Sequence, residues 1–175
     1  MKRTSIYLLL CGVLLCTVAW AESGVMENKY GTILISDAGI VSHGSQLFFC
    51  NGLMAEKGNS LGSVSFAVGP LLNGSIRSGG TFSADGSSLT ITGLCKKKDE
   101  PRGVVFIGSF EGDVTWSLVN VVGQELTFSL SGTVKGTNRR GKKVRAAVVQ
   151  TIVTTIDQLA QSVGHIKAGI VMFGT

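Results

Sequence analysis

The chain has 175 residues and a formal net charge of +5, with 16 basic residues against 11 acidic ones. Its mean hydropathy is +0.35 and only 15% of its residues are charged, which excludes a disordered chain, because disorder requires low hydropathy and high charge. The 24 glycines occur among many serines, threonines and valines, a composition typical of an all-β protein with frequent turns.

The first 21 residues have the features of a secretory signal peptide. Lys2 and Arg3 form a basic head, residues 6–18 are an uncharged apolar run, and Ala19 and Ala21 occupy the small-residue positions that signal peptidase recognises. We therefore predict cleavage after Ala21 and a secreted protein, either periplasmic or extracellular.

The alternatives for this segment are an uncleaved anchor and a lipoprotein. The apolar run is short for a membrane span, and Leu10 and Leu15 precede Cys11 and Cys16 where a lipidated cysteine normally follows a small residue. We expect one domain over residues 22–175, with no transmembrane helix. Removal of Lys2 and Arg3 lowers its net charge from +5 to +3.

The first half of the mature chain contains short apolar segments separated by turn signals. The dipeptide Asp85-Gly86 lies between two alternating segments, which predicts a hairpin between them. The strands predicted in this half cover residues 30–36, 46–50, 63–68, 74–76, 80–84 and 88–92.

The clearest period of two runs through residues 103–134. Trp116, Phe128 and Leu130 belong to one side of this pattern, whereas Thr127 and Ser129 belong to the other. Successive side chains of a strand point to opposite faces, so the pattern indicates antiparallel strands with one apolar and one hydroxyl-bearing face.

The last quarter of the chain permits two interpretations. Residues 142–156 are rich in β-branched side chains and predict a strand, followed by a terminal strand over residues 166–173. Apolar residues between Ile152 and Ile170 also recur at spacings of three and four, so a short helix around residues 158–163 is the alternative.

Together these segments predict a single antiparallel β-sandwich of the immunoglobulin-like or jelly-roll kind, with a β-barrel as the alternative. The segments GSFEGDVTW (residues 108–116) and LTFSLSGTVKGT (residues 126–137) resemble secreted bacterial β-sandwich proteins rich in glycine and threonine. The resemblance implies the fold alone and assigns no functional residue.

Two cysteines, Cys50 and Cys95, remain after signal cleavage. In an oxidising compartment such a pair is expected to form a disulfide, and two buried thiols are the alternative.

Few residues have the spacing that catalysis or metal binding requires. His43 and His165 lack partners at ligand spacing, so we expect no metal and no cofactor. Glu111 and Asp113 flank Gly112 at a turn and form the basis of a distant alternative, a glycan-active enzyme.

Basic residues gather at two predicted turns. If both turns lie at the same end of the fold, they form a site for an anionic surface, an acidic glycan or nucleic acid. The residues concerned are Lys96, Lys97, Lys98 and Arg102 in the first turn, and Lys135, Arg139, Arg140, Lys142, Lys143 and Arg145 around the second.

The sequence therefore predicts a secreted, non-enzymatic protein that is a binding or structural surface module. A polyanion-binding module that uses the two basic turns is the alternative. If the basic residues only keep the exposed turns soluble, they bind no polyanion, and the first prediction then applies.

Overall fold

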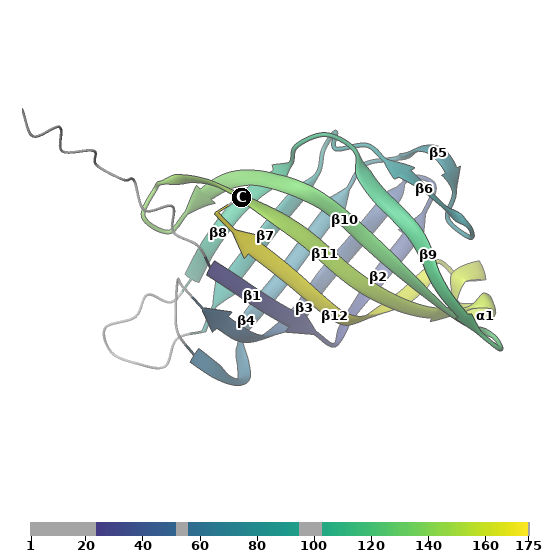
Figure 1. The fold of residues 1–175 in the computed structure, drawn as a ribbon, viewed down its shortest axis with the longest axis horizontal. Coiled ribbons are helices and arrows are strands. Elements are labelled where there is room, and N and C mark those ends of the chain that lie inside the picture. The colour runs from purple at the N-terminus through teal and green to yellow at the C-terminus, as the bar shows by residue number, and fades with distance from the viewer. Residues whose placement is uncertain (1–23, 52–55, 95–102, 175) are drawn as a thin grey trace, which may run out of the picture.

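The computed structural model describes residues 24–51, 56–94 and 103–174. These residues form twelve antiparallel strands, joined in one sheet, and one short helix (Figure 1). The elements are β1 (Gly24–Lys29), β2 (Gly31–Ser36), β3 (Gly39–Asn51), β4 (Glu56–Val68), β5 (Leu71–Ser75), β6 (Gly79–Phe82), β7 (Ser88–Gly93), β8 (Gly103–Phe110), β9 (Val114–Val122), β10 (Glu125–Asn138), β11 (Lys143–Thr155), α1 (Ile156–Ala160) and β12 (Val163–Phe173).

The sheet closes into an 8-stranded antiparallel β-barrel (Figure 1). β1 and β2 together occupy one position in the wall, separated by Tyr30, and β3, β4, β7, β8, β10, β11 and β12 follow in chain order. The last strand completes the circuit, because β12 pairs with β11 along one edge and with β1 and β2 along the other.

The all-β prediction is confirmed, but the sandwich is wrong and the barrel alternative is the observed fold. A sandwich has two separate sheets, whereas the hydrogen-bonded pairing here continues around the whole wall. Alternation in the sequence gives an apolar inner face in either architecture. What separates the two is the pairing of β12 with the N-terminal strands, which no local pattern encodes.

β10 pairs with β11 along almost its whole length but with β8 only near its end, and the rest of this edge supports an extension of the sheet. Its residues Val134–Asn138 pair with β8, and its residues Glu125–Ser131 pair with β9. On its other edge β9 carries β6 and then β5, which lie beside it at one end of the molecule (Figure 1).

The hairpin predicted around Asp85-Gly86 is wrong, although the turn itself is present. β6 pairs with β5 and β9, whereas β7 pairs with β4 and β8. The backbone of Ser83 instead exchanges hydrogen bonds with residues 69 and 70, its N–H donating to Pro70 O and its oxygen accepting from Gly69 N–H, each at 2.8 Å. The chain therefore crosses from the extension to the barrel at this point.

Apolar side chains fill the barrel, as the alternation predicts. Ile33, Phe66, Ile91 and Phe106 are among the residues with at most 1% of their surface exposed. The ring of Phe106 meets the ring of Phe173 edge to face, with centroids 5.3 Å apart, so the last strand contributes to this core.

A second aromatic cluster lies between the extension and β10. Trp116 stacks on Phe128 with ring centroids 4.3 Å apart, and Phe82 meets Trp116 edge to face at 6.4 Å. The indole N–H of Trp116 donates to Ile76 O at 3.0 Å, so the tryptophan also ties the turn between β5 and β6 to β9.

A set of hydrogen-bonded polar side chains lies in the barrel interior. Asn28 and Gln150 are fully buried and exchange two amide hydrogen bonds, of 2.9 and 3.2 Å. Asn28 also donates to Ser45 Oγ at 2.6 Å, and Ser45 donates to Val64 O at 3.1 Å. Gly169 on β12 is the register partner of both Asn28 and Gln150, so the two amides meet across a residue without a side chain.

The C-terminal region combines both sequence interpretations. β11 confirms the strand predicted up to residue 156, and β12 contains the predicted terminal strand but begins three residues earlier, at Val163. Between them α1 corresponds to the short-helix alternative. It is initiated by a capping box, in which the Thr155 hydroxyl accepts from Gln158 N–H and the Gln158 side chain accepts from Thr155 N–H.

The predicted signal peptide lies outside the described residues, as do Cys95 and the side chain of Cys50. Within the described ranges, no helix has the length and apolarity needed to cross a membrane.

Candidate anion-binding site

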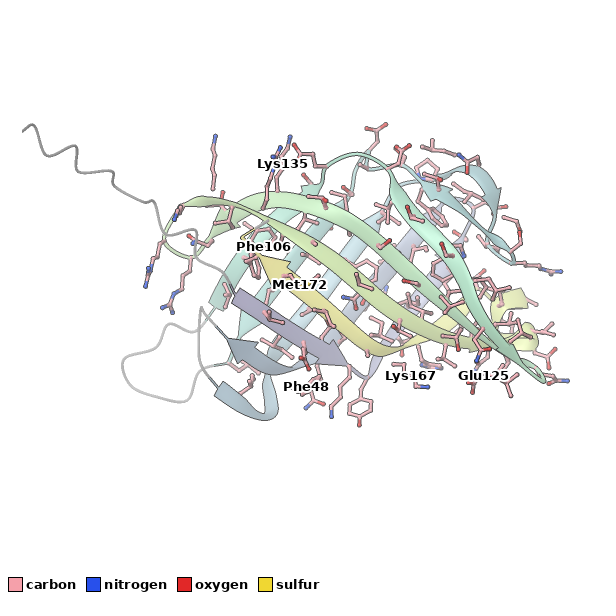
Figure 2. The ribbon with its side chains drawn as sticks, in the orientation of Figure 1. Phe48, Phe106, Glu125, Lys135, Lys167 and Met172 are labelled. Atoms are coloured by element: carbon pink, nitrogen blue, oxygen red, sulfur yellow. The ribbon has the colours of Figure 1, made fainter. Side chains whose placement is uncertain are left out.

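A groove on the outer wall of the barrel gathers several of the predicted basic residues. It spans β8, β10 and β11 and has a volume of about 530 Å³. Lys135 projects outward from β10 there (Figure 2). The groove is lined by Ser109, Lys135, Gly136, Thr137, Lys143, Val144 and Arg145.

The strand register fixes the order of the groove residues. Lys135 on β10 is opposite Ser109 on one side and Arg145 on the other, and two residues further along, Thr137 is opposite Lys143. Like charges directly opposite each other destabilise a sheet, so the Lys135–Arg145 pair needs a local counter-charge.

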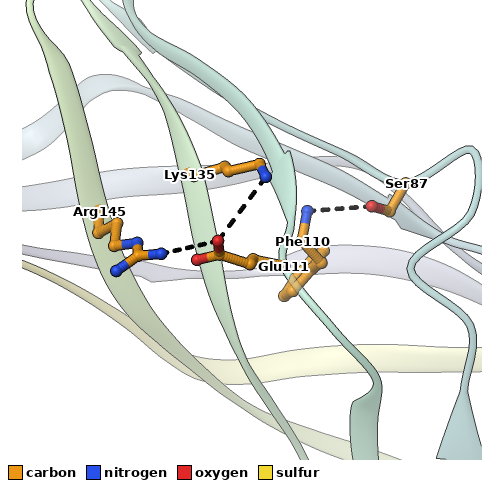
Figure 3. A network of polar contacts seen from close by, with 5 residues as sticks. All are labelled: Ser87, Phe110, Glu111, Lys135 and Arg145. Atoms are coloured by element: carbon orange, nitrogen blue, oxygen red, sulfur yellow. Dashed lines mark hydrogen bonds and ion pairs between the residues drawn. The ribbon is translucent and has the colours of Figure 1, made fainter.

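Glu111 provides this counter-charge. Its Oε1 accepts a 2.7 Å hydrogen bond from Arg145 Nη2 and lies 3.7 Å from Lys135 Nζ (Figure 3). The backbone holds the residue in place, because Glu111 N–H donates to Thr133 O at 2.7 Å and the preceding Phe110 N–H donates to Ser87 Oγ at 3.0 Å. The carboxylate is therefore positioned between two cations by elements of the barrel wall.

The ion pairs affect the ionisation of this carboxyl group. The hydrogen bond from Arg145 holds the pKa of Glu111 below the ordinary value of a glutamate, and the nearby charges of Arg145 and Lys135 act in the same direction. A lowered folded-state pKa means that the pair stabilises the fold at neutral pH. This contribution is lost as the pH falls through the folded-state pKa.

Arg145→Ser is therefore expected to raise the pKa of Glu111 toward its ordinary value, because the group that lowers it most is removed. An NMR titration of the Glu111 carboxyl carbon measures the change. Lys167→Ser, which removes a cation from β12, should leave the titration where it is in the wild type. An unchanged Glu111 pKa in Arg145→Ser would show that the 2.7 Å hydrogen bond does not persist in solution.

The other residues of the second basic turn lie beside the groove. Arg139, Arg140 and Lys142 are exposed in the turn between β10 and β11. Asn138 organises this turn, since its side-chain oxygen accepts from the backbone N–H groups of Arg140 and Lys142, both at 3.0 Å.

The first basic turn lies outside the described residues, which include none of Lys96, Lys97, Lys98 and Arg102. The strands that flank it are described: Gly93 and Gly103 are paired, and Phe106 is paired with Asn138. The start of β8 is thus at the same barrel end as the turn between β10 and β11.

The remaining candidate residues are exposed or partly exposed. Glu111 is held by cations, and Asp113 is exposed after the end of β8. His43 on β3 and His165 on β12 are exposed. In the part of the chain that the structure describes, no group of three or more histidine, cysteine, aspartate or glutamate side chains is arranged to hold a metal ion.

The sequence interpretation missed the hydroxyl groups of the groove and the role of Glu111. Ser109 and Thr137 belong to the outward-facing phase of the alternation, together with Lys135, Lys143 and Arg145, and this shared phase was a usable signal. Comparison with protein-family models, with curated proteins and with solved structures gives no match.

Proposed function

We propose that this protein is a secreted, non-enzymatic binding module that binds a polyanion, such as an acidic glycan, in the groove across β8, β10 and β11. The observation that carries this proposal is the pairing of Lys135 on β10 with Arg145 on β11. Lys143 lies two residues before Arg145 on the same strand and lines the same groove. Three cations in one groove give an extended anionic chain several contacts at once.

The lining of the groove favours a glycan over a single-stranded nucleic acid. Ser109 and Thr137 offer hydroxyl groups that hydrogen-bond to sugars as well as to anionic oxygens. None of the lining residues is aromatic, whereas proteins that bind single strands stack bases on aromatic side chains.

The proposal also states that the protein is secreted and that it is not an enzyme. The basic head, apolar run and Ala19-Trp20-Ala21 site support export and cleavage near Ala21. A glycosidase needs a carboxylic acid whose pKa is raised so that it donates a proton. Glu111 has its pKa lowered by Arg145, so it does not supply this acid, and its carboxylate serves as a counter-charge within the groove.

The test is elution of the protein spanning residues 22–175 from a heparin column against a salt gradient. The double variant Lys143→Ser/Arg145→Ser is expected to elute at much lower salt than the wild type, because two cations leave the groove. The matched control is Arg77→Ser/Lys167→Ser, which removes the same charge from exposed residues outside the groove and should elute near the wild type.

Equal losses in the two double variants would show that retention follows net charge alone. Elution of the wild type at low salt would contradict polyanion binding and leave the runner-up, a structural surface module whose cations keep its turns soluble.

A further inference from the structure

We infer that Glu111 is a built-in competitor that makes the groove select densely charged polymers, such as sulfated or phosphorylated glycans, over polymers with isolated carboxylates. This inference rests on the proposed function and concerns the same groove. Its basis is the fixed position of Glu111 between the two opposed cations (Figure 3).

Arg145 is already paired with the carboxylate of Glu111, the same kind of group that a carboxylate ligand would offer it. Glu111 Oε1 lies 2.7 Å from Arg145 Nη2, the distance of a short charge-assisted hydrogen bond. Because Glu111 is attached to the wall through the backbone hydrogen bonds of residues 110 and 111, it returns to Arg145 without loss of translational freedom. A ligand carboxylate would exchange one such bond for an equivalent one, which provides little net affinity.

A densely charged ligand can bind cations of the groove that Glu111 does not neutralise. Glu111 offsets one of the three cations, so an excess of two positive charges remains across Lys135, Lys143 and Arg145. A chain with several sulfate or phosphate groups engages Lys143 and the free side of Lys135 at once, and its additional charge then competes with Glu111 for Arg145. Binding through several cations at once also releases more counterions.

Glu111→Gln tests the inference because it keeps the size of the side chain and removes its charge. Heparin, which is heavily sulfated, and hyaluronan, which carries one carboxylate in each disaccharide, serve as the two probes. The wild type is expected to bind heparin and to bind hyaluronan weakly. The variant should bind hyaluronan about threefold more tightly, as expected when a competing exposed ion pair is removed, with a smaller gain for heparin.

Two further variants make the comparison specific. Glu125→Gln removes the same charge at the other end of β10, away from Lys135, and should change neither affinity (Figure 2). Glu111→Asp shortens the side chain by one methylene and draws the carboxylate back from Arg145, so its hyaluronan affinity should lie between those of the wild type and Glu111→Gln. Glu111 is partly exposed, which makes both substitutions compatible with folding.

The outcomes separate this inference from the proposed function. A wild type that binds heparin, together with equal hyaluronan affinities in Glu111→Gln and Glu125→Gln, would overturn the competitor role and leave polyanion binding in place. A wild type that binds neither polymer in a salt-dependent way would overturn both. A rise in hyaluronan affinity that is confined to the Glu111 variants and exceeds their gain for heparin supports the inference, whereas an equal gain for both polymers would overturn the selectivity.

Discussion

Gly169→Ala is expected to lower the free energy of unfolding by about 3 kcal/mol, since it would break the paired amides in the barrel interior and leave buried polar groups unpaired. A Cβ atom at this position would overlap Gln150 Oε1 and Asn28 Oδ1. Neither amide can turn to water, because both residues are fully buried. Urea denaturation, followed by circular dichroism, measures the loss.

The neighbouring residue provides the control for this change. Ala168 is exposed on the outer wall, so Ala168→Val adds more atoms to the same strand and should change stability by less than about 0.5 kcal/mol. A loss below about 1 kcal/mol in Gly169→Ala would contradict the prediction, because it would show that the interior accommodates a methyl group without breaking the amide pair.

Trp116→Ala is expected to cost about 4 kcal/mol of stability, the magnitude typical of removing a large buried aromatic side chain. The substitution removes the stacked contact with Phe128, the edge contact with Phe82 and the hydrogen bond to Ile76 O. We expect β5 and β6 to lose their attachment to β9 before the barrel unfolds, since this cluster joins the extension to β10.

Trp116→Phe separates the packing of this cluster from its hydrogen bond. Phenylalanine retains an aromatic ring but cannot donate to Ile76 O, so a smaller loss, of about 1–2 kcal/mol, is expected. Trp20 and Trp116 are the two tryptophans of the chain, so in the protein spanning residues 22–175 tryptophan fluorescence reports on Trp116 alone. A wild-type emission maximum at the wavelength of exposed indole would contradict the buried position of this residue.

The sequence predicted the parts of this fold that depend on neighbouring residues. The alternation through residues 103–134 predicted β8, β9 and β10 and placed Trp116, Phe128 and Leu130 in the core, because side-chain direction in a strand follows from position alone. The turn at Asp85-Gly86 was also predicted locally, because an Asp-Gly dipeptide between two alternating segments favours a tight turn. The partners of the flanking strands were not, since pairing depends on where the rest of the sheet lies.

Features that depend on distant residues had no sequence signal. Asn28 and Gln150 are 122 positions apart, and only barrel closure brings their amides together. The groove was partly predictable, because Lys135, Lys143 and Arg145 stood out as a basic cluster. Glu111 was considered with Asp113 as its neighbour in the chain, whereas its actual partners are set by the register of β10 and β11.

The pairing of β12 with β1 and β2 has a consequence for the order of events during biogenesis. A chain synthesised from its N-terminus exposes the open edges of β1 and β2 until residues 163–173 have been made. Contacts between segments that lie far apart in a chain form slowly, because the intervening loop must close first. Barrel closure is thus postponed until residues 163–173 are available, whatever the state of the strands between.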